Sequence, residues 1–226
     1  MREEAETHND VVVEDFVDAY VNLTLKTIFM LKWTVRHCSS VPFLLKTDDD
    51  MLINVHRLLD ELPEKFDPST PLVIGRIQEN ARPYRDKTSK WYLPVSLYKQ
   101  PAFPTFAAGT GYLITKAALT RIYWSALDTP VIPLEDVFVT GLVANAKLGI
   151  PLVSLQGFHN KKPASSEHAC LYYPHLTLHE LSPGQMRRVW DSLQGLTARD
   201  CDTPYTRLLI YMFGIGKSKV DRDYTW

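Results

Sequence analysis

Phe43-Leu44-Leu45-Lys46-Thr47-Asp48-Asp49-Asp50 is the stretch of this chain that decides its fold. The short apolar run predicts a buried strand over 43–47, and the three aspartates that follow it predict an acidic turn. A second short strand is expected over 51–53, followed by a helix over 54–62 with Asn54 at its N-cap. Ligands bind at the ends of strands in open α/β sheets, so this turn is a candidate binding site.

Outward from this stretch, helical and strand patterns alternate along the chain, which predicts the α/β class. The expected elements are helices over 14–37, 116–127 and 135–148, a helix capped by Ser182, a strand over 72–75, loops over 63–71 and 76–105, and a tight turn at 109–111.

The composition is that of an ordinary globular domain, with 45% apolar and 23% charged residues in 226. A net charge of -1 gives no reason to expect a nucleic-acid partner. The apolar run 208–215 is far shorter than the roughly 20 residues that span a bilayer, so no membrane anchor is expected within this chain. The three cysteines are either buried thiols, or Cys170 and Cys201 form a disulfide in an oxidising compartment.

The aspartate triplet can be a solvated acidic turn, or it can hold a cation that relieves the repulsion between its carboxylates. Mg²⁺ and Mn²⁺ prefer carboxylate oxygen and often bridge to a diphosphate. Two other acidic sites are excluded by spacing. A dehalogenase-type phosphatase would need Thr or Val where Leu52 stands, and a calcium-binding EF-hand loop would need Gly at Ile53 and Glu at Leu59.

Glu135 and Asp136 open a predicted helix, where the helix dipole favours carboxylates. They are equally suited to act as a general base that takes a proton from an attacking hydroxyl. His179, which follows an apolar alternation, can complete the coordination of a carboxylate-bound cation. On composition alone, His159, His168 and His175 compete with His179 for that role.

Together and in this order, the motifs resemble those of the β-1,3-galactosyltransferases, glycosyltransferase family 31. This family includes β-1,3-N-acetylglucosaminyltransferases and is related to fringe. The resemblance covers about Glu14 to Asp191. The motifs that carry it are Glu14-Asp15-Phe16-Val17-Asp18-Ala19-Tyr20-Val21-Asn22-Leu23-Thr24-Leu25-Lys26-Thr27, Lys46-Thr47-Asp48-Asp49-Asp50, Lys90-Trp91-Tyr92, Gly109-Thr110-Gly111-Tyr112, Glu135-Asp136-Val137 and His179-Glu180-Leu181-Ser182-Pro183.

The resemblance implies a GT-A fold with a Rossmann-like sheet and an inverting transfer that depends on Mn²⁺. The donor would be UDP-galactose or UDP-N-acetylglucosamine, and the acceptor a glycan on a glycoprotein or glycolipid. By the same resemblance, Asp50 and His179 would hold the metal, and Asp48 would contact the ribose or the metal shell, with Asp49 beside it.

Further site residues are implied by the resemblance as well. Asp136 would be the catalytic base, and Glu135 would contact the acceptor or serve as an alternative base. Trp91 and Tyr92 would line the sugar-binding cleft, and Gly109 and Gly111 would let the backbone approach the substrate.

Two departures from the family are expected to matter. Family members usually carry Cys where Ala107 or Ala108 stands, so one disulfide of the family is expected to be absent. Members also have a membrane anchor and an upstream half-Rossmann segment before the Glu14 motif. The chain is therefore expected to be N-terminally truncated, with an exposed sheet edge.

The expected organisation is a polar stub over 1–13, the catalytic domain over 14–200 and a tail over 201–226. The family's place is the lumenal side of the Golgi membrane, and the membrane would be reached only through an anchor absent from this chain. The alternative to an active enzyme is a catalytically silent fragment that binds UDP or a partner.

Overall fold

A computed structural model describes residues 2–159, 161 and 168–213. Its main sheet has the strand order β1-β4-β3-β5, formed by β1 (Phe43–Thr47), β4 (Phe106–Thr115), β3 (Val73–Gln78) and β5 (Leu152–Ser154). The pairs β1–β4 and β3–β4 are antiparallel, whereas β3–β5 is parallel. The fold is thus α/β, with β1 at one edge of a mixed sheet and the long β4 hydrogen-bonded on both sides.

Neighbouring residues of the inner strands point to opposite faces of the sheet, and other elements cover both faces. Tyr112 and Ile114 of β4 pack into a cluster with α2 (Leu23–His37) and α4 (Lys116–Leu127). Leu113, which lies between them, packs instead with α3 (Val55–Lys65) and the 155–158 turn. A strand covered on both faces reads as a continuous apolar run rather than an alternation.

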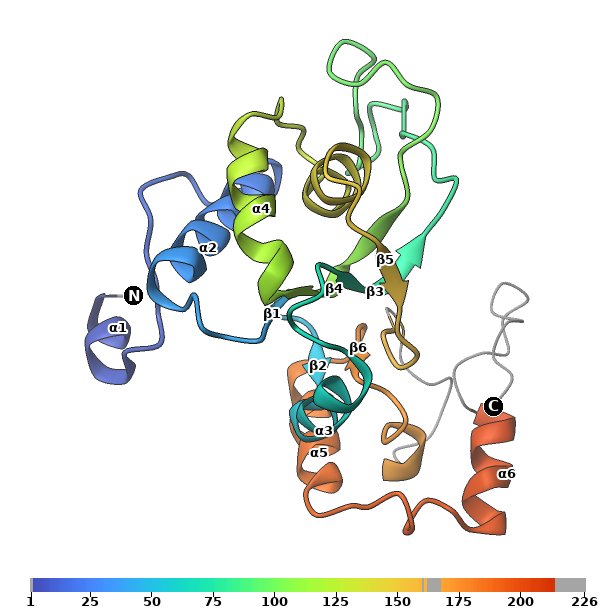
Figure 1. The fold of residues 1–226 in the computed structure, drawn as a ribbon. Coiled ribbons are helices and arrows are strands. Elements are labelled where there is room, and N and C mark those ends of the chain that lie inside the picture. The colour runs from blue at the N-terminus through green and yellow to red at the C-terminus, as the bar shows by residue number, and fades with distance from the viewer. Residues whose placement is uncertain (1, 160, 162–167, 214–226) are drawn as a thin grey trace.

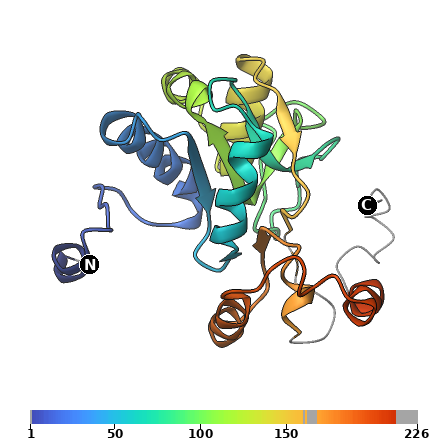
Figure 2. The same ribbon diagram turned by 60° about the horizontal axis from the view of Figure 1, so that its bottom comes forward.

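A smaller unit packs around the two-stranded ribbon of β2 (Leu52–Ile53) and β6 (Thr177–Leu178), at the end of the molecule opposite α4 (Figures 1 and 2). Its core joins Leu52 and Leu178 to α5 (Pro183–Leu193) and α6 (Pro204–Phe213). A disulfide between Cys170 and Cys201 closes this unit, as one of the two sequence interpretations expected, and Cys38 is a free thiol. The division into 1–13, 14–200 and 201–226 stays a prediction.

Several expected elements are confirmed. The strand over 43–47 and the helix over 116–127 have their predicted bounds. Asn54 caps α3 by accepting a hydrogen bond from the Arg57 N–H, and Ser182 and Gln185 form a full capping box at α5. The caps were predictable because they depend on hydrogen bonds within one turn of chain, and the strand and the helix because of their apolar patterns.

The helix expected over 14–37 begins only at Leu23, after a short 3₁₀ turn, Tyr20–Asn22. Residues 14–19 are not helical, because their side chains bind back onto α2 instead of continuing it. Glu14 pairs with Lys32 at 2.7 Å and Asp18 pairs with Lys26 at 2.8 Å. A further helix, α1 (Arg2–His8), lies within the expected polar stub.

Two loop predictions were wrong. The helix α3 continues through Pro63 to Lys65, because a proline in the last turn removes only one helical hydrogen bond and the Phe66 N–H still bonds the Leu62 carbonyl. Gly109-Thr110-Gly111 is no turn but the middle of β4, where Gly111 pairs with Thr47. Small residues there permit close approach of neighbouring groups rather than a reversal of the chain.

The predicted helix at 135–148 is present but widened. After one turn begun by Glu135 and Asp136, η2 (Val137–Lys147) is a π-helix, and at its end the Leu148 N–H bonds the Val143 carbonyl. Gly149 adopts the left-handed φ of 64° expected of a residue that ends a helix. π-Helical segments often occur at functional sites. No helix in the described part of the chain is long and apolar enough to cross a membrane.

His159 and His175 form a buried pair beneath the β2–β6 ribbon, with ring centroids 4.6 Å apart. Burial, together with the nearby His159 and Arg57, lowers the pKa of His175 to about 3. A histidine that stays neutral in the folded state but takes a proton near pH 6.5 when unfolded makes the protein less stable as the pH falls below 6.5.

His175→Gln is therefore expected to destabilise the protein less in acid than at neutral pH. The difference in unfolding free energy between wild type and variant should shrink by about 1.4 kcal/mol between pH 7.5 and pH 5.5. Urea denaturation at both pH values measures it, with the exposed His37→Gln as the control. A pH-independent difference would contradict the prediction.

Candidate active site

The aspartate triplet follows β1 and its members point to different partners. Asp48 is half-exposed and its Oδ1 lies 2.6 Å from the Lys46 Nζ. Asp50 contacts His179, with 2.9 Å between Oδ2 and Nε2. Asp49 between them is exposed. The three aspartates are therefore not equivalent, because the outer two pair with different side chains.

The β2–β6 ribbon brings Asp50 and His179 together across 129 positions of sequence. Leu52 pairs with Leu178 in antiparallel register, so the residues just beyond this pair on the two strands lie side by side. His159 and His175 are buried, and His168 accepts a hydrogen bond from the Cys170 N–H as the cap of a 3₁₀ turn. The strand register therefore places His179, rather than His159, His168 or His175, beside Asp50.

The Asp50–His179 pair fits a divalent cation in its chemistry and spacing. Carboxylate oxygen and imidazole nitrogen both suit Mn²⁺-like ions. The two side chains are hydrogen-bonded to each other at 2.9 Å, so both atoms are near enough to share one cation. Among the described residues, no cluster of three or more His, Cys, Asp or Glu side chains is arranged to hold a metal. The other coordination positions would fall to water or to a bound ligand.

Glu135 is the buried member of the acid pair, with 6% of its surface exposed. Its carboxylate accepts a hydrogen bond from the Tyr112 hydroxyl and lies 3.4 Å from the Lys46 Nζ. Burial raises the pKa of Glu135 to about 7, against the opposing effect of Lys46. A carboxyl group surrounded in this way is held in place by the protein and has little freedom to meet a substrate.

Asp136 is the more accessible member, and backbone N–H groups orient it. Its Oδ2 accepts from the Gly109 N–H at 3.0 Å and its Oδ1 from the Val137 N–H at 2.8 Å. Each carboxylate oxygen keeps a further lone pair for a substrate hydroxyl. Burial also raises the pKa of Asp136, although these N–H bonds and Lys46 oppose the rise. An oriented carboxylate with a raised pKa is what a general base requires.

Lys46 connects the acid pair to the aspartate triplet. Besides Asp48 and Glu135, its ammonium donates to the Gly109 carbonyl at 2.8 Å. Burial alone would lower the pKa of Lys46, but the charges of Glu135 and Asp48 outweigh it and the pKa is raised. Sequence reasoning gave this lysine no role. Strand periodicity was the signal that could have indicated its contact with Asp48, because residues two apart in a strand share a face.

The aromatic residues divide between the site and its surroundings. Trp91 is exposed, and burial raises the pKa of the nearby Tyr20, which the apolar spacing predicts within a helix. Tyr92 is half-buried, and its N–H bonds the Ser89 carbonyl. Gly111 lies in the sheet near Thr177. A Cβ added at Gly111 would lie 3.6 Å from the Thr177 side chain. The proposed substrate-binding roles of Trp91, Tyr92, Gly109 and Gly111 stay predictions.

Gly109 sets the position of Asp136 by the absence of a side chain. A Cβ at Gly109 would lie 3.2 Å from the Asp136 Cβ and Oδ2, which is closer than most real contacts, whereas one at Gly111 would have ordinary contacts. Gly109→Ala is therefore expected to lower turnover at least about tenfold by displacing this carboxylate. Steady-state kinetics on the two alanine variants test this, and equal rates for Gly109→Ala and Gly111→Ala would refute it.

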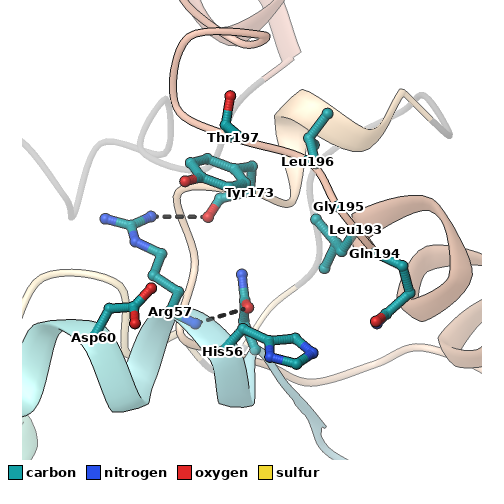
Figure 3. A pocket seen from close by; sticks show the side chains of 10 residues that line it. His56, Arg57, Asp60, Tyr173, Leu193, Gln194, Gly195, Leu196 and Thr197 are labelled. Carbon is teal, nitrogen blue, oxygen red and sulfur yellow. Dashed lines mark hydrogen bonds between the residues drawn. The ribbon is translucent and has the colours of Figure 1, made fainter.

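A separate pocket of about 340 Å³ lies between the start of α3 and the turn that follows α5 (Figure 3). Arg57 crosses it and donates to the Tyr173 carbonyl at 2.8 Å. The lining includes His56, Asp60 and Thr197, and it shares no residue with the acid pair, the triplet or His179.

A model of the family described as galactosyltransferase matches residues 1–156. Beta-1,3-galactosyltransferase 1 of Homo sapiens is 36% identical over 193 residues, which cover 85% of this chain and 58% of that relative. Beta-1,3-galactosyltransferase 5 of Homo sapiens is 34% identical over 200 residues, which cover 88% and 64%.

The UDP-GlcNAc:betaGal beta-1,3-N-acetylglucosaminyltransferase 7 of Rattus norvegicus is 31% identical over 190 residues, which cover 81% of this chain and 47% of the relative. The chain thus spans between about half and two thirds of the length of these curated relatives.

Proposed function

Because this chain belongs to the galactosyltransferase family, we propose that it transfers a hexose from a UDP-sugar to a sugar hydroxyl of a glycan, forming a β-1,3 linkage with inversion. The donor would be UDP-galactose or UDP-N-acetylglucosamine, as the names of the relatives suggest. The observation that carries the proposal is that Lys46 pairs both with Glu135 of the acid pair and with Asp48, two positions from the Asp50 that pairs with His179.

In the proposed reaction, Asp136 accepts the proton of the acceptor hydroxyl as its oxygen forms a bond to the anomeric carbon. The bond from that carbon to UDP breaks on the opposite face. Backbone N–H bonds fix the direction of the Asp136 carboxylate throughout. Glu135, enclosed by Tyr112 and Lys46, is too buried to attack as a nucleophile, which favours a single inverting displacement.

Mn²⁺ bound at Asp50 and His179 would offset the negative charge that builds on the leaving diphosphate. Asp50 and His179 would hold this metal from the protein side. Asp48 is held by Lys46, so its role is better explained by contact with the nucleotide than by direct coordination.

A lumenal place in the Golgi, in the glycosylation of proteins or lipids, goes with this function. The Cys170–Cys201 disulfide supports it, since such bonds form in oxidising compartments.

Calorimetric titration of UDP with and without Mn²⁺, followed by donor-panel transfer assays, tests the function. We expect UDP binding that requires Mn²⁺ and weakens at least about tenfold in Asp50→Ala and in His179→Ala. Asp202→Ala, which removes an exposed carboxylate paired with Arg207, is the matched control. Equal transfer rates for wild type and Asp50→Ala would overturn the proposal, and UDP binding without turnover would leave a silent nucleotide-binding fragment in its place.

A further inference from the structure

A buried hydroxyl joins the acid pair to the main sheet. Thr140 lies in η2 with none of its surface exposed, and its hydroxyl donates to the Asp136 backbone carbonyl at 2.6 Å. The same oxygen accepts a hydrogen bond from the Ala107 N–H of β4 at 2.9 Å. The hydroxyl has only one proton, and the Ala107 carbonyl lies farther away, at 3.4 Å. One side-chain atom therefore links the backbone of Asp136 to β4.

The part of β4 that Thr140 holds departs from regular strand pairing. The register between β3 and β4 shifts, so that residues 108–111 of β4 stand opposite a single residue of β3. A bulge of this kind re-aims the groups that it carries and often lies next to an active site. This one carries Gly109, whose N–H bonds the Asp136 Oδ2 at 3.0 Å. Ala107 is the residue at which the bulge begins, so its bond to Thr140 fixes one end of the bulge.

The contact between η2 and the start of β4 is close around this hydroxyl. A Cβ added at Gly141 would lie 3.1 Å from the Phe106 Cβ and 3.3 Å from the Pro104 Cγ, so the next residue of the helix also lies against this segment. A threonine that bonds the carbonyl four residues earlier competes with the N–H groups of its own helix and often distorts it. Here the helix has the wide π form. Thr140 is thus a fixed link between two elements, with no freedom to turn toward solvent.

Thr115 offers a matched reference at the other end of β4. It is fully buried as well, and its hydroxyl accepts from the Leu72 N–H at 2.9 Å and donates to the Thr70 carbonyl at 2.8 Å. None of these groups belongs to the acid pair. A buried threonine with two backbone hydrogen bonds is usually there for stability alone. Thr115 therefore measures that contribution, and Thr140 differs from it by its contact with Asp136.

We propose that Thr140 is a positioning residue for Asp136. By tying Ala107 to the Asp136 carbonyl, it keeps the Gly109 N–H aimed at the Asp136 carboxylate, and that carboxylate aimed at the substrate. Thr140 is buried and touches no substrate, so its effect passes through these backbone groups. The reaction that Asp136 serves rests on the proposed function above, whereas the hydrogen bonds do not.

Hydrogen exchange of the backbone amides, followed by NMR on the 226-residue chain, tests this hold without any substrate. Thr140→Val keeps the shape of the side chain but removes both hydrogen bonds. The Gly109 amide should then exchange at least about tenfold faster relative to the amides of Tyr112 and Ile114, because only the bulge is released. Thr140→Ser keeps the hydroxyl and should leave this ratio within about twofold of wild type. Thr115→Val should not speed exchange at Gly109 more than in the rest of β4.

Steady-state kinetics of sugar transfer on the same variants tests the consequence. Thr140→Val is expected to lower the turnover number about tenfold and to change the Michaelis constant for the donor less than about twofold, because a misplaced base affects the chemical step. Thr140→Ser should restore turnover, and Thr115→Val should keep it. If Thr140→Val does not fold, Thr140→Cys takes its place, because a thiol has a similar shape and makes only weak hydrogen bonds.

The outcomes separate this inference from the proposed function. If Gly109 exchanges no faster in the Thr140 variant than the other amides of β4 do, the inference is wrong whether or not the chain transfers sugar. If exchange rises as expected but turnover stays at the wild-type value, Thr140 holds the strand without positioning the base, and the inference is wrong as well. If exchange rises but the wild-type chain neither binds UDP nor transfers sugar, the hold of Thr140 on Asp136 stands and the transferase proposal falls.

Discussion

Asp136→Asn is expected to lower the turnover number for sugar transfer by about 10²–10⁴-fold, which is the usual contribution of a general base. An asparagine has nearly the same shape but cannot accept the proton of the acceptor hydroxyl. The Michaelis constant for the donor should change little, because the nucleotide side of the proposed site rests on Asp48, Asp50 and His179.

This variant needs a check on folding, because the asparagine can accept only one of the two N–H bonds that Asp136 accepts. A stability loss of about 1–3 kcal/mol is expected from the unpaired N–H group, and thermal unfolding measures it. Glu135→Gln is the informative comparison, since glutamine can still accept from the Tyr112 hydroxyl. If Glu135→Gln abolished transfer and Asp136→Asn did not, the two roles would have to be exchanged.

Lys46→Met is expected to produce the largest loss of stability among single substitutions in the site. Its ammonium is buried and neutralises Glu135, which is buried as well. At a pH where Glu135 is ionised, removing one member of a buried ion pair typically costs about 3–5 kcal/mol, because the remaining charge is left without a partner, and at lower pH the cost falls as Glu135 takes up a proton. Lys26→Met removes an exposed pair with Asp18 and should cost less than about 1 kcal/mol.

The effect of Lys46→Met should depend on pH, and its sign follows from Glu135. Burial raises the pKa of Glu135 to about 7, above the ordinary 4.5, so this group favours the folded state at low pH and loses that contribution as the pH rises. Lys46 opposes the rise, so its removal raises the pKa of Glu135 further. The variant should therefore be more destabilised at pH 8 than at pH 5.

Chemical denaturation at the two pH values measures this difference. The double variant Lys46→Met with Glu135→Gln should recover much of the lost stability, because no buried carboxylate is then left unpaired. A loss that is the same at both pH values and is not recovered in the double variant would show that Lys46 contributes through packing rather than charge.

The places of the candidate residues in the fold were predictable where the signal was local and not where a contact was long-range, and their roles stay predictions. The triplet at the end of a strand and the acid pair at the start of a helix are both in the expected places. Sequence could not divide roles within either group. Asp48 pairs with Lys46 whereas Asp50 pairs with His179, and Glu135 differs from Asp136 because it is enclosed by Tyr112.

Tyr20 shows how apolar periodicity can mislead a prediction. Its spacing matched a helix, yet the segment before Leu23 binds back onto α2 through Glu14 and Asp18, and the ring is left exposed. Side-chain ion pairs over eight or eighteen positions leave no trace in a pattern of apolar residues.

By itself, the sequence determined the α/β class, the strand that leads into Asp48-Asp49-Asp50 and the caps at Asn54 and Ser182. Each of these depends on apolar periodicity or on hydrogen bonds within a few residues, and both can be read along the chain. Only the tertiary structure decided that His179 meets Asp50, that Gly109 lies against Asp136 and that Lys46 joins the two halves of the site. Those contacts follow from the register of paired strands and from burial, which depend on residues far apart in sequence.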